Sequence, residues 1–332
     1  MMSRLFAASL VACVLAGACF NRPRGQLMLA IDTDMSAGTD FDRLRIEVLV
    51  KGVPQPYTNT WLEFGRPGQI VTFPTTFGIV ENSDPTTSIH IRVITGLAGG
   101  ANPDVGTPMH LREIITTVPD DRTVLLRVRL DWLCSGYSSL QGVYIEGGCN
   151  EGQTCIAGSC VDWTVDSKML PTFDERDVFG GGTRKGDGAC FDTLPCFEQA
   201  MTVAPDNDCT FPKPAGDVNV ALVPQKGQGG ICAGDSCIVP LDKGAPFGWT
   251  EASGRVVLPQ AVCVALKDFL PGPVGADGKH TELRLRAILV STRCPAKPAS
   301  LPTCGPWSTV TTKPGGDASI PLPPSDAGLD GG

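Results

Sequence analysis

RLRIEVLV, residues 43–50, decides the fold class, because its apolar and polar side chains alternate with a period of two. The even positions of this stretch are all aliphatic: Leu44, Ile46, Val48 and Val50. On the other face, Arg45 and Glu47 would meet water. Alternation of this kind predicts a β-strand with one buried face and one solvated face.

Six further segments before residue 133 have the same strand character, and turn residues separate them. They are residues 27–32, 59–64, 70–73, 89–93, 111–117 and 126–130. Seven strands in about 100 residues are the number typical of an immunoglobulin-like sandwich. We therefore predict an immunoglobulin-like β-sandwich for residues 26–132.

Cysteines become frequent at residue 133, and large apolar side chains become rare. This change predicts a small cysteine-rich, disulfide-held module over residues 133–162. The segment TCIAGSCV, residues 154–161, has the form of a hairpin with a two-residue Ala-Gly turn. Its two cysteines would then lie opposite each other, so they could bond together or both reach outward.

Four cysteines in this module allow three disulfide pairings. We favour Cys134 with Cys155 and Cys149 with Cys160. A zinc site is the alternative for these residues, but the C-x2-C spacing of common structural zinc sites is absent.

A second β-rich, disulfide-bonded domain is predicted for residues 163–310, which contain eight cysteines and frequent Gly and Pro. Its clearest strand-like segments are residues 218–223 and 282–291. One helix is predicted at residues 259–268, with a proline at its start. Residues 311–332 contain Pro, Gly, Ser and Asp but no aromatic residue, and we expect them to be a disordered tail.

The N-terminus has the pattern of a secretory signal peptide, predicted for residues 1–18. Arg4 supplies a positive charge, and residues 5–18 contain no charged side chain. This apolar run is shorter than the roughly 20 residues that a helix needs to cross a bilayer. We therefore expect cleavage, which leaves residues 19–25 as a short tether.

The segment LAGAC, residues 15–19, resembles the lipobox of bacterial lipoproteins, in which a cysteine receives diacylglycerol and becomes the new N-terminus. Its Leu15 lies one position further from the cysteine than in the strongest lipoboxes. The alternatives are a lipobox ending at Cys13 and an ordinary signal peptide cut at Ala-Gly-Ala. We favour Cys19, whose several acyl chains, palmitate among them, would give stable anchoring. Phe20 follows in place of Asp, which the resemblance links to the outer membrane.

Twelve cysteines remain once Cys13 is removed with the signal peptide and Cys19 is lipidated. An even number suits a disulfide framework, and an exported chain passes through an oxidising compartment. We predict six disulfides, none of which joins the first four cysteines to the last eight. The twelve are Cys134, Cys149, Cys155, Cys160, Cys190, Cys196, Cys209, Cys232, Cys237, Cys263, Cys294 and Cys304.

Residues 32–42 bring together four carboxylates that could bind calcium: Asp32, Asp34, Asp40 and Asp42. Calcium prefers oxygen ligands, but the EF-hand spacing and its bidentate Glu are missing. Asp is also common in the turns that end strands, because its side chain bonds nearby backbone. The turn interpretation is favoured, and we predict no metal and no cofactor.

No catalytic motif stands out. The three histidines, His90, His110 and His280, lack the spacing of a metalloprotease, and we expect all three at the surface. Ser236 stands in a Gly-Asp-Ser segment like that of chymotrypsin-like proteases, but Cys237 replaces the glycine that should follow. A disulfide is therefore predicted there in place of a nucleophile.

Trp249 is the tryptophan least committed to a predicted strand. An exposed indole would offer a stacking surface to a glycan, although core packing is the commoner role of tryptophan. We keep Trp249 as a candidate glycan-binding residue.

Four parts of the chain carry a resemblance to a known group of proteins: LAGAC (15–19), DTDM with DFDRL (32–35 and 40–44), CNEGQTC (149–155) and CGPW (304–307). With these segments the chain resembles the cysteine-rich lipoproteins of myxobacteria. The resemblance implies a location in the cell envelope and no particular activity.

The sequence therefore predicts a lipid-anchored protein of the cell envelope, on the outer membrane, with binding or structural modules outside the cytoplasm. A cell-surface glycan or protein is the expected partner. The net charge of −8 and the scattered basic residues argue against nucleic acid. The alternative is a hydrolase with a dispersed active site, which grouped carboxylates with divergent pKa values in a deep pocket would favour.

Overall fold

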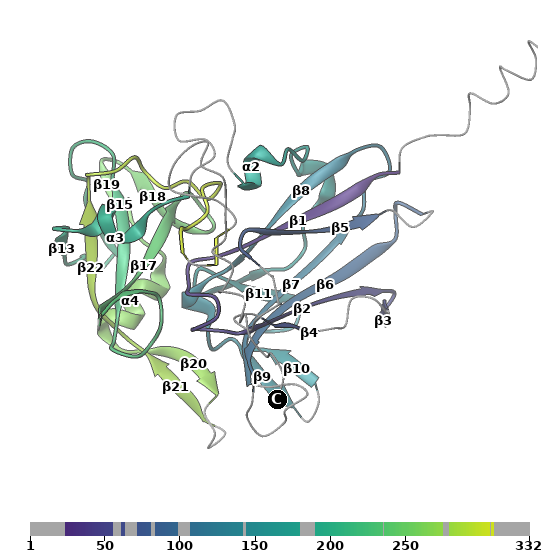
Figure 1. Ribbon diagram of the computed structural model, residues 1–332, viewed down its shortest axis with the longest axis horizontal. Helices are drawn as coiled ribbons and strands as arrows, with labels where there is room; N and C mark the ends of the chain where they lie inside the picture. The colour runs from purple at the N-terminus through teal and green to yellow at the C-terminus, as the bar shows by residue number, and fades with distance from the viewer. Residues whose placement is uncertain are drawn as a thin grey trace, which may run out of the picture.

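The computed structural model describes residues 24–55, 61–63, 72–80, 84–98, 107–141, 144–179, 190–234, 236–274, 279–305 and 307–308. These residues form a mainly β structure with several sheets, arranged in two lobes that lie side by side (Figure 1). The first lobe is residues 24–179 and the second lobe is residues 190–305. No helix among the described residues is long and apolar enough to span a membrane.

The first lobe is built on two sheets. The smaller has the order β5-β1-β8, and its strands are β1 (Gln26–Thr33), β5 (Thr75–Val80) and β8 (Thr123–Leu130), with β1 parallel to β8. The larger has the order β3-β2-β6-β7, with β4 also paired to β2. Its strands are β2 (Arg43–Val50), β3 (Val53–Pro54), β4 (Trp61–Glu63), β6 (Ser88–Leu97) and β7 (Thr107–Thr117). Alternate residues of both sheets, such as Leu29 and Ile91, are fully buried in one core.

Most strands follow the alternation of the sequence. Strand β2 spans the predicted residues 43–50, and the predicted segments 27–32, 89–93, 111–117 and 126–130 all lie inside longer strands.

The predicted strand at residues 70–73 differs from the structure. Residues 70 and 71 lie outside the described residues, and Phe73 forms only an isolated bridge with Ser308. The strand next to this point is β5, which begins at Thr75 and pairs with β1.

The cysteine-rich module consists of two short hairpins, formed by β9 (Ser138–Gln141) with β10 (Tyr144–Gly147) and by β11 (Gln153–Ile156) with β12 (Ser159–Asp162). The turn of the second hairpin has positive φ at Ala157 and Gly158, as the two-residue turn requires. Cys155 lies opposite Cys160, yet both reach outward, to Cys134 and Cys149 respectively. The favoured pairing is confirmed.

The chain stays on the first lobe beyond residue 163, where the sequence predicted a new domain. Val165 donates a backbone hydrogen bond to Ile115, and Phe173 donates one to Thr123, so this segment extends the edges of both sheets. It contains the 3₁₀ turn η2 (Ser167–Met169) and helix α2 (Arg176–Phe179). Backbone pairing, which composition does not reveal, decides where this segment belongs.

The second lobe contains a sheet with the order β13-β22-β15-β17-β18-β19-β14, to which β16 adds beside β17. Its strands are β13 (Met201–Val203), β14 (Thr210–Pro212), β15 (Asn219–Pro224), β16 (Ile231–Ala233), β17 (Ser236–Lys243), β18 (Gly248–Ala252), β19 (Arg255–Val257) and β22 (Leu285–Ser291). Helices α3 (Thr193–Phe197) and α4 (Gln260–Lys267) pack on it, α4 as predicted. A separate hairpin joins β20 (Leu270–Val274) to β21 (His280–Leu283).

The predicted strand at residues 282–291 is divided between β21 and β22. In β22, Ile288 and Val290 join the main core, whereas Ala287 and Leu289 pack against a second core with Phe197. Both faces of this strand are therefore covered by side chains.

Six disulfides pair all twelve cysteines that follow Cys19, and none joins the first four to the last eight, as predicted. Besides the two in the module, they are Cys190–Cys304, Cys196–Cys294, Cys209–Cys263 and Cys232–Cys237.

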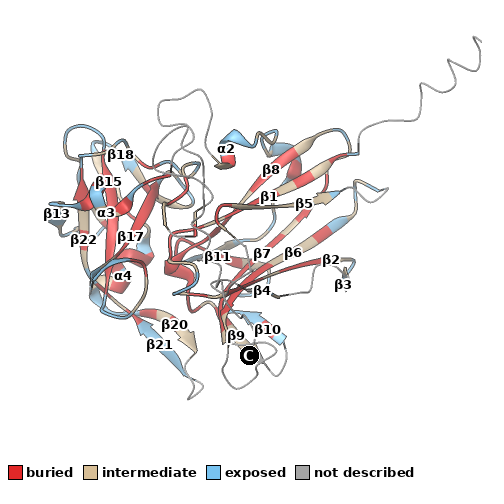
Figure 2. Cartoon of the chain, viewed as in Figure 1, coloured by how far each residue is buried: buried red, intermediate tan, exposed pale blue. Residues whose placement is uncertain are grey.

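The two lobes share one continuous apolar core, visible as buried segments on both sides of the junction (Figure 2). Trp132 in the 3₁₀ turn η1 (Trp132–Cys134) is buried there, and its indole Nε1 donates to the carbonyl of Gln228 over 2.6 Å. The C-terminal segment returns to the first lobe, where Phe73 donates a backbone hydrogen bond to Trp307. The lobes are therefore packed as one unit.

Candidate functional site

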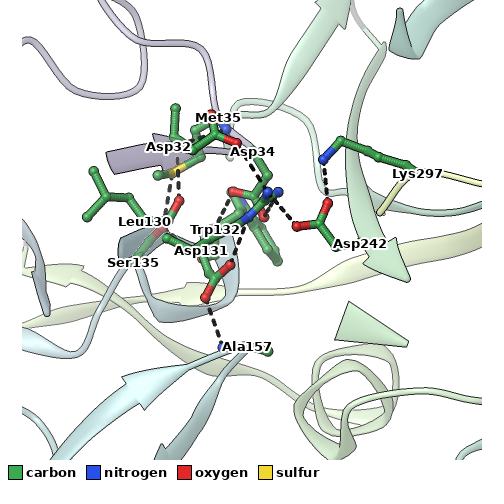
Figure 3. Close-up of polar contacts among 12 residues, drawn as sticks. Asp32, Asp34, Met35, Leu130, Asp131, Trp132, Ser135, Ala157, Asp242 and Lys297 are labelled. Carbon is green, nitrogen blue, oxygen red and sulfur yellow. Dashed lines mark hydrogen bonds and ion pairs between the residues drawn. The ribbon is translucent and has the colours of Figure 1, made fainter. Parts of the chain in front are cut away.

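A group of buried charges lies where the lobes meet, and Figure 3 shows how its side chains converge from both lobes. We call it the charge network. Its members are Arg129, Lys297, Asp32, Asp34, Asp131 and Asp242. It is the densest gathering of titratable side chains in the described part of the chain, and so it is the first candidate for chemistry.

Strand pairing brings the first-lobe members together. The parallel register of β1 and β8 sets Asp32 opposite Arg129, and Asp34 and Asp131 follow just after these two strands end. Thr33 fixes this end of the pair, because its Oγ1 donates to the carbonyl of Leu130 over 3.0 Å.

Arg129 is the centre of the network. Its Nη1 lies 2.6 Å from Asp242 Oδ2 in the second lobe and 3.5 Å from Asp32 Oδ2. Its Nε lies 3.3 Å from Asp131 Oδ1, and its Nη2 lies 3.9 Å from Asp34 Oδ2. The ion pair with Asp242 is therefore the tightest of these contacts, and it crosses between the lobes.

The second lobe adds a further cation. Lys297 Nζ forms an ion pair with Asp242 Oδ1, so this carboxylate is shared between two cations. Asp242 has no exposed side-chain surface, and Lys297 has almost none. Removing one partner of such a pair would leave a buried charge without compensation.

The carboxylates also hold backbone groups in place. Asp34 Oδ1 accepts the Trp132 backbone N–H over 2.8 Å, and Asp131 Oδ2 accepts that of Ala157 over 3.0 Å. The network therefore connects the lobe junction to the turn of the cysteine-rich hairpin. Some of its carboxylate oxygens therefore bind backbone groups and stabilise the fold.

Burial dominates the electrostatics of this network. It raises the pKa of Asp34 to about 8 and also raises the pKa values of Asp32 and Asp131, although Arg129 acts against each rise. Burial lowers the pKa of Lys297 despite the attraction of Asp242. For Arg129 burial acts to lower the pKa, but the surrounding carboxylates, Asp242 first, raise it above its usual range. Arg129 therefore stays charged.

A small pocket reaches the edge of the network, lined by Asp32, Arg127 and Arg129 among mostly apolar residues such as Val178 and Phe247. Its volume of about 20 Å³ is room for about one water molecule. Asp34, Asp131 and Asp242 do not line this pocket. The carboxylates are grouped and their pKa values are raised, but this pocket is too small to bring a substrate to them.

The four calcium candidates separate in the structure. Asp32 and Asp34 join the charge network, whereas Asp40 Oδ2 accepts backbone N–H groups from Ser36 over 2.9 Å and Gly230 over 2.8 Å. Asp42 accepts the backbone N–H of Ala98 over 2.6 Å. Asp40 thus has a turn role that also binds the second lobe. Among the described residues no group of three or more His, Cys, Asp or Glu side chains is placed to hold a metal.

The expectation that all three histidines lie at the surface is wrong for His110, which is 2% exposed. Its Nδ1 lies 2.7 Å from Thr95 Oγ1 and its Nε2 lies 2.9 Å from Ser135 Oγ. Burial lowers the pKa of His110 to about 3. The serine and histidine are both buried, so they belong to a structural hydrogen-bond chain inside the core.

The other two histidines are less buried. His90 is half-buried, with its Nε2 3.2 Å from Glu113 Oε1, and its ring packs beside that of Trp163. His280 is exposed, and its Nδ1 lies 2.7 Å from the carbonyl of Gly272.

Trp249 is 1% exposed, so the prediction of an exposed stacking surface there is wrong. Its ring lies in the core of the second lobe with Lys243 Nζ 5.5 Å from the ring centroid. Cys237, next to Ser236, is bonded to Cys232, as expected from the sequence.

The geometry makes the charge network a joint between the lobes. Asp242 binds Arg129 across the junction, and Ser36 Oγ donates to the carbonyl of Gly230 over 2.8 Å beside it. Only Asp32 and Arg129 of its members touch the small pocket. Comparisons with models of protein families, with curated proteins and with solved structures find no match for this chain.

Proposed function

We propose that this chain is a lipoprotein of the cell envelope, anchored at Cys19 and placed on the outer membrane, that acts as a binding or structural module. The observation that carries this proposal is the disulfide pairing of the cysteines. All twelve after Cys19 are paired in disulfides, which suits an oxidising compartment. That leaves Cys13 within the apolar run and Cys19 directly after its small residues, where a lipobox would place it.

The joint between the lobes supports a role in binding or support. A continuous core, the cross-lobe pair of Arg129 and Asp242 and the contacts at Gly230 hold the lobes in one arrangement. A fixed arrangement presents a surface to a partner without the entropy cost of ordering it. The two facing sheets of the first lobe agree with the immunoglobulin-like sandwich that we propose for it, and a cell-surface glycan or protein is the partner we expect.

Mass spectrometry of the N-terminal peptide tests the anchor. In protein made by a bacterium with a lipoprotein pathway, we expect a diacylglyceryl group on Cys19 and recovery of the chain in the membrane fraction. Cys19→Ala should release the chain to the soluble fraction, whereas the matched variant Cys13→Ala should stay with the membrane. An unmodified Cys19 in the wild-type chain would refute the anchor.

A hydrolase is the second candidate, and the grouped carboxylates with raised pKa values are the observation that favours it. A panel of glycoside, ester and peptide substrates, run with the purified protein, separates the two. Turnover that Asp32→Asn abolishes while the fold is retained would establish the hydrolase. We expect no turnover, because the pocket that Asp32 lines holds about 20 Å³.

A further inference from the structure

A larger cavity opens at the other end of the first lobe, far from the charge network. Its volume is about 350 Å³, within the range of small-molecule sites. It lies between the two sheets where the chain enters β1, and we call it the tether-end cavity. Its lining is Arg24, Val48, Val50, Gln55, Ile79, Val80, Asp84, Thr87, Ile89 and Val118.

The strand register explains why this cavity exists. Ile79 lies opposite Leu27 at the end of the smaller sheet, and Val50 lies opposite Ile89 at the end of the larger one. These last inward-facing side chains are aliphatic, and none of the described residues that line the space is aromatic. Facing sheets stand about 10 Å apart, so short side chains at their ends leave room between them.

The chemistry of the lining is divided between wall and rim. Six of the ten lining residues are Val or Ile, which suit a flexible aliphatic chain, and the other four are polar. Polar side chains come from the chain ends and turns around the opening. Of these, Asp84 accepts hydrogen bonds from the hydroxyls of Thr86 and Thr87, which lower its pKa and keep it negatively charged, and Arg24 is exposed and positively charged. A cavity with six aliphatic side chains, and with Arg24 as the cation among its polar residues, fits a molecule with one acyl chain and an acidic group in its head.

We propose that the tether-end cavity binds one acyl chain of a membrane lipid, with the acidic head of the lipid near Arg24. Burial of an aliphatic chain there is favourable, because each methylene is removed from water. Two exposed aliphatic side chains at the same end, Val53 and Val80, are 62% and 49% exposed and extend this apolar surface.

The short tether indicates which ligand is within reach of the cavity, and this step rests on the proposed lipid anchor. Cys19 lies five residues before Arg24, so even a fully extended tether spans at most about 18 Å. An anchored protein would therefore hold the opening of the cavity within reach of the bilayer. The nearest partner for the cavity is then a lipid of the membrane that holds the protein.

The test uses the full mature chain with Cys19→Ala, which carries no lipid of its own. Equilibrium dialysis against radiolabelled palmitate and against lysophosphatidylglycerol measures binding of one acyl chain with two different heads. We expect saturable binding of one molecule per chain. Binding of lysophosphatidylglycerol, with or without palmitate, supports a membrane lipid as the ligand, whereas binding of palmitate alone would overturn it in favour of a free fatty acid. Absence of saturable binding of either probe would overturn the proposal.

Variants locate the binding. Ile79→Trp fills the cavity and Val80→Trp obstructs its opening, so each should weaken binding at least tenfold. Val264→Trp places the same indole on a half-exposed position of α4 in the second lobe and should change binding less than twofold. Circular dichroism verifies that each variant is folded. If Ile79→Trp does not fold, Val80→Trp, whose substitution lies at an exposed position, tests the cavity alone. Equal binding by the folded cavity variant and the control would also overturn the proposal.

The two failures are distinguishable. Because the test protein lacks Cys19, loss of acyl-chain binding says nothing about anchoring, and mass spectrometry of the wild-type N-terminus reads anchoring independently.

Discussion

The two ends of the first lobe are built from the same alternating strands, yet they are completed in different ways. At the junction end, Phe41 and Phe73 pack edge to face with centroids 5.8 Å apart, Trp132 fills the space between the lobes, and the charge network lies beside them. At the tether end, aliphatic residues leave a cavity of about 350 Å³. Period-two patterning builds the middle of a sandwich, whereas the large side chains of irregular segments decide whether an end is solid or open.

Removing the centre of the charge network should have the largest effect on stability. Arg129→Met leaves the carboxylates of the first lobe buried without their cation, so we expect a loss of about 3–5 kcal/mol in the free energy of unfolding. Urea denaturation at pH 7 measures it. A loss below about 1 kcal/mol would mean that the network contributes little to the stability of the junction end.

A matched pair of truncations compares the ends directly. Phe41 has no exposed surface, and Phe41→Ala should cost about 3–5 kcal/mol, because it removes a large side chain from a packed core. Ile79 is half-buried beside the cavity, so Ile79→Ala should cost only about 1 kcal/mol, part of the value for full burial. Equal losses in urea denaturation would contradict the distinction between a packed end and an open end.

The junction end should also give stability a dependence on pH. Asp34 has a folded pKa of about 8, above its ordinary 3.8, so its contribution is full below pH 3.8 and is lost as the pH rises through 8. His110 has a folded pKa of about 3, below its ordinary 6.5, so its contribution is full above pH 6.5 and is lost as the pH falls through 3. The two oppose each other between these limits, and above pH 6.5 the effect of Asp34 remains.

We therefore expect the free energy of unfolding to fall between pH 6.5 and pH 8 through Asp34. The raised pKa values of Asp32 and Asp131 act in the same direction above pH 3.8. Asp34→Asn should flatten this part of the profile, whereas His110→Gln should change only the acidic part. Thermal denaturation across the pH range measures both variants. An unchanged alkaline slope in Asp34→Asn would locate the effect elsewhere.

The smallest effect is expected for an exposed ion pair. Arg176 binds Asp174 at the surface, where their side chains are 55% and 37% exposed. Arg176→Ala should leave the free energy of unfolding almost unchanged, since solvent screens exposed pairs. A loss comparable to that of Arg129→Met would show that burial does not distinguish the two arginines.

Much of the β structure could be predicted because it is local. Strand β2 follows from its own alternation, and the two-residue turn sets Cys155 opposite Cys160 as expected. The turn left three disulfide pairings open, and the favoured one is observed. Strand β5 was missed because TTFGIV includes a glycine and shows little alternation.

The charge network could not be predicted, because its members meet only through long-range pairing. Asp32 and Arg129 come from β1 and β8, which are 97 residues apart at this point, and Asp242 comes from the other lobe. The Asp-rich segment was a visible signal, but two of its carboxylates, Asp32 and Asp34, contact the guanidinium of Arg129 and not a metal ion. Burial of His110 and Trp249 likewise depends on neighbours that no local pattern identifies.

The Cys190–Cys304 disulfide has a mechanical consequence. It joins the two points where the second lobe begins and ends, closing a loop with a sequence separation of 114 residues. If the chain were pulled between its N-terminus and a site beyond residue 304, the tension would pass from Cys190 to Cys304 through this bond. The second lobe would then bear no stretching load, and its sheet could stay folded while the rest of the chain was extended.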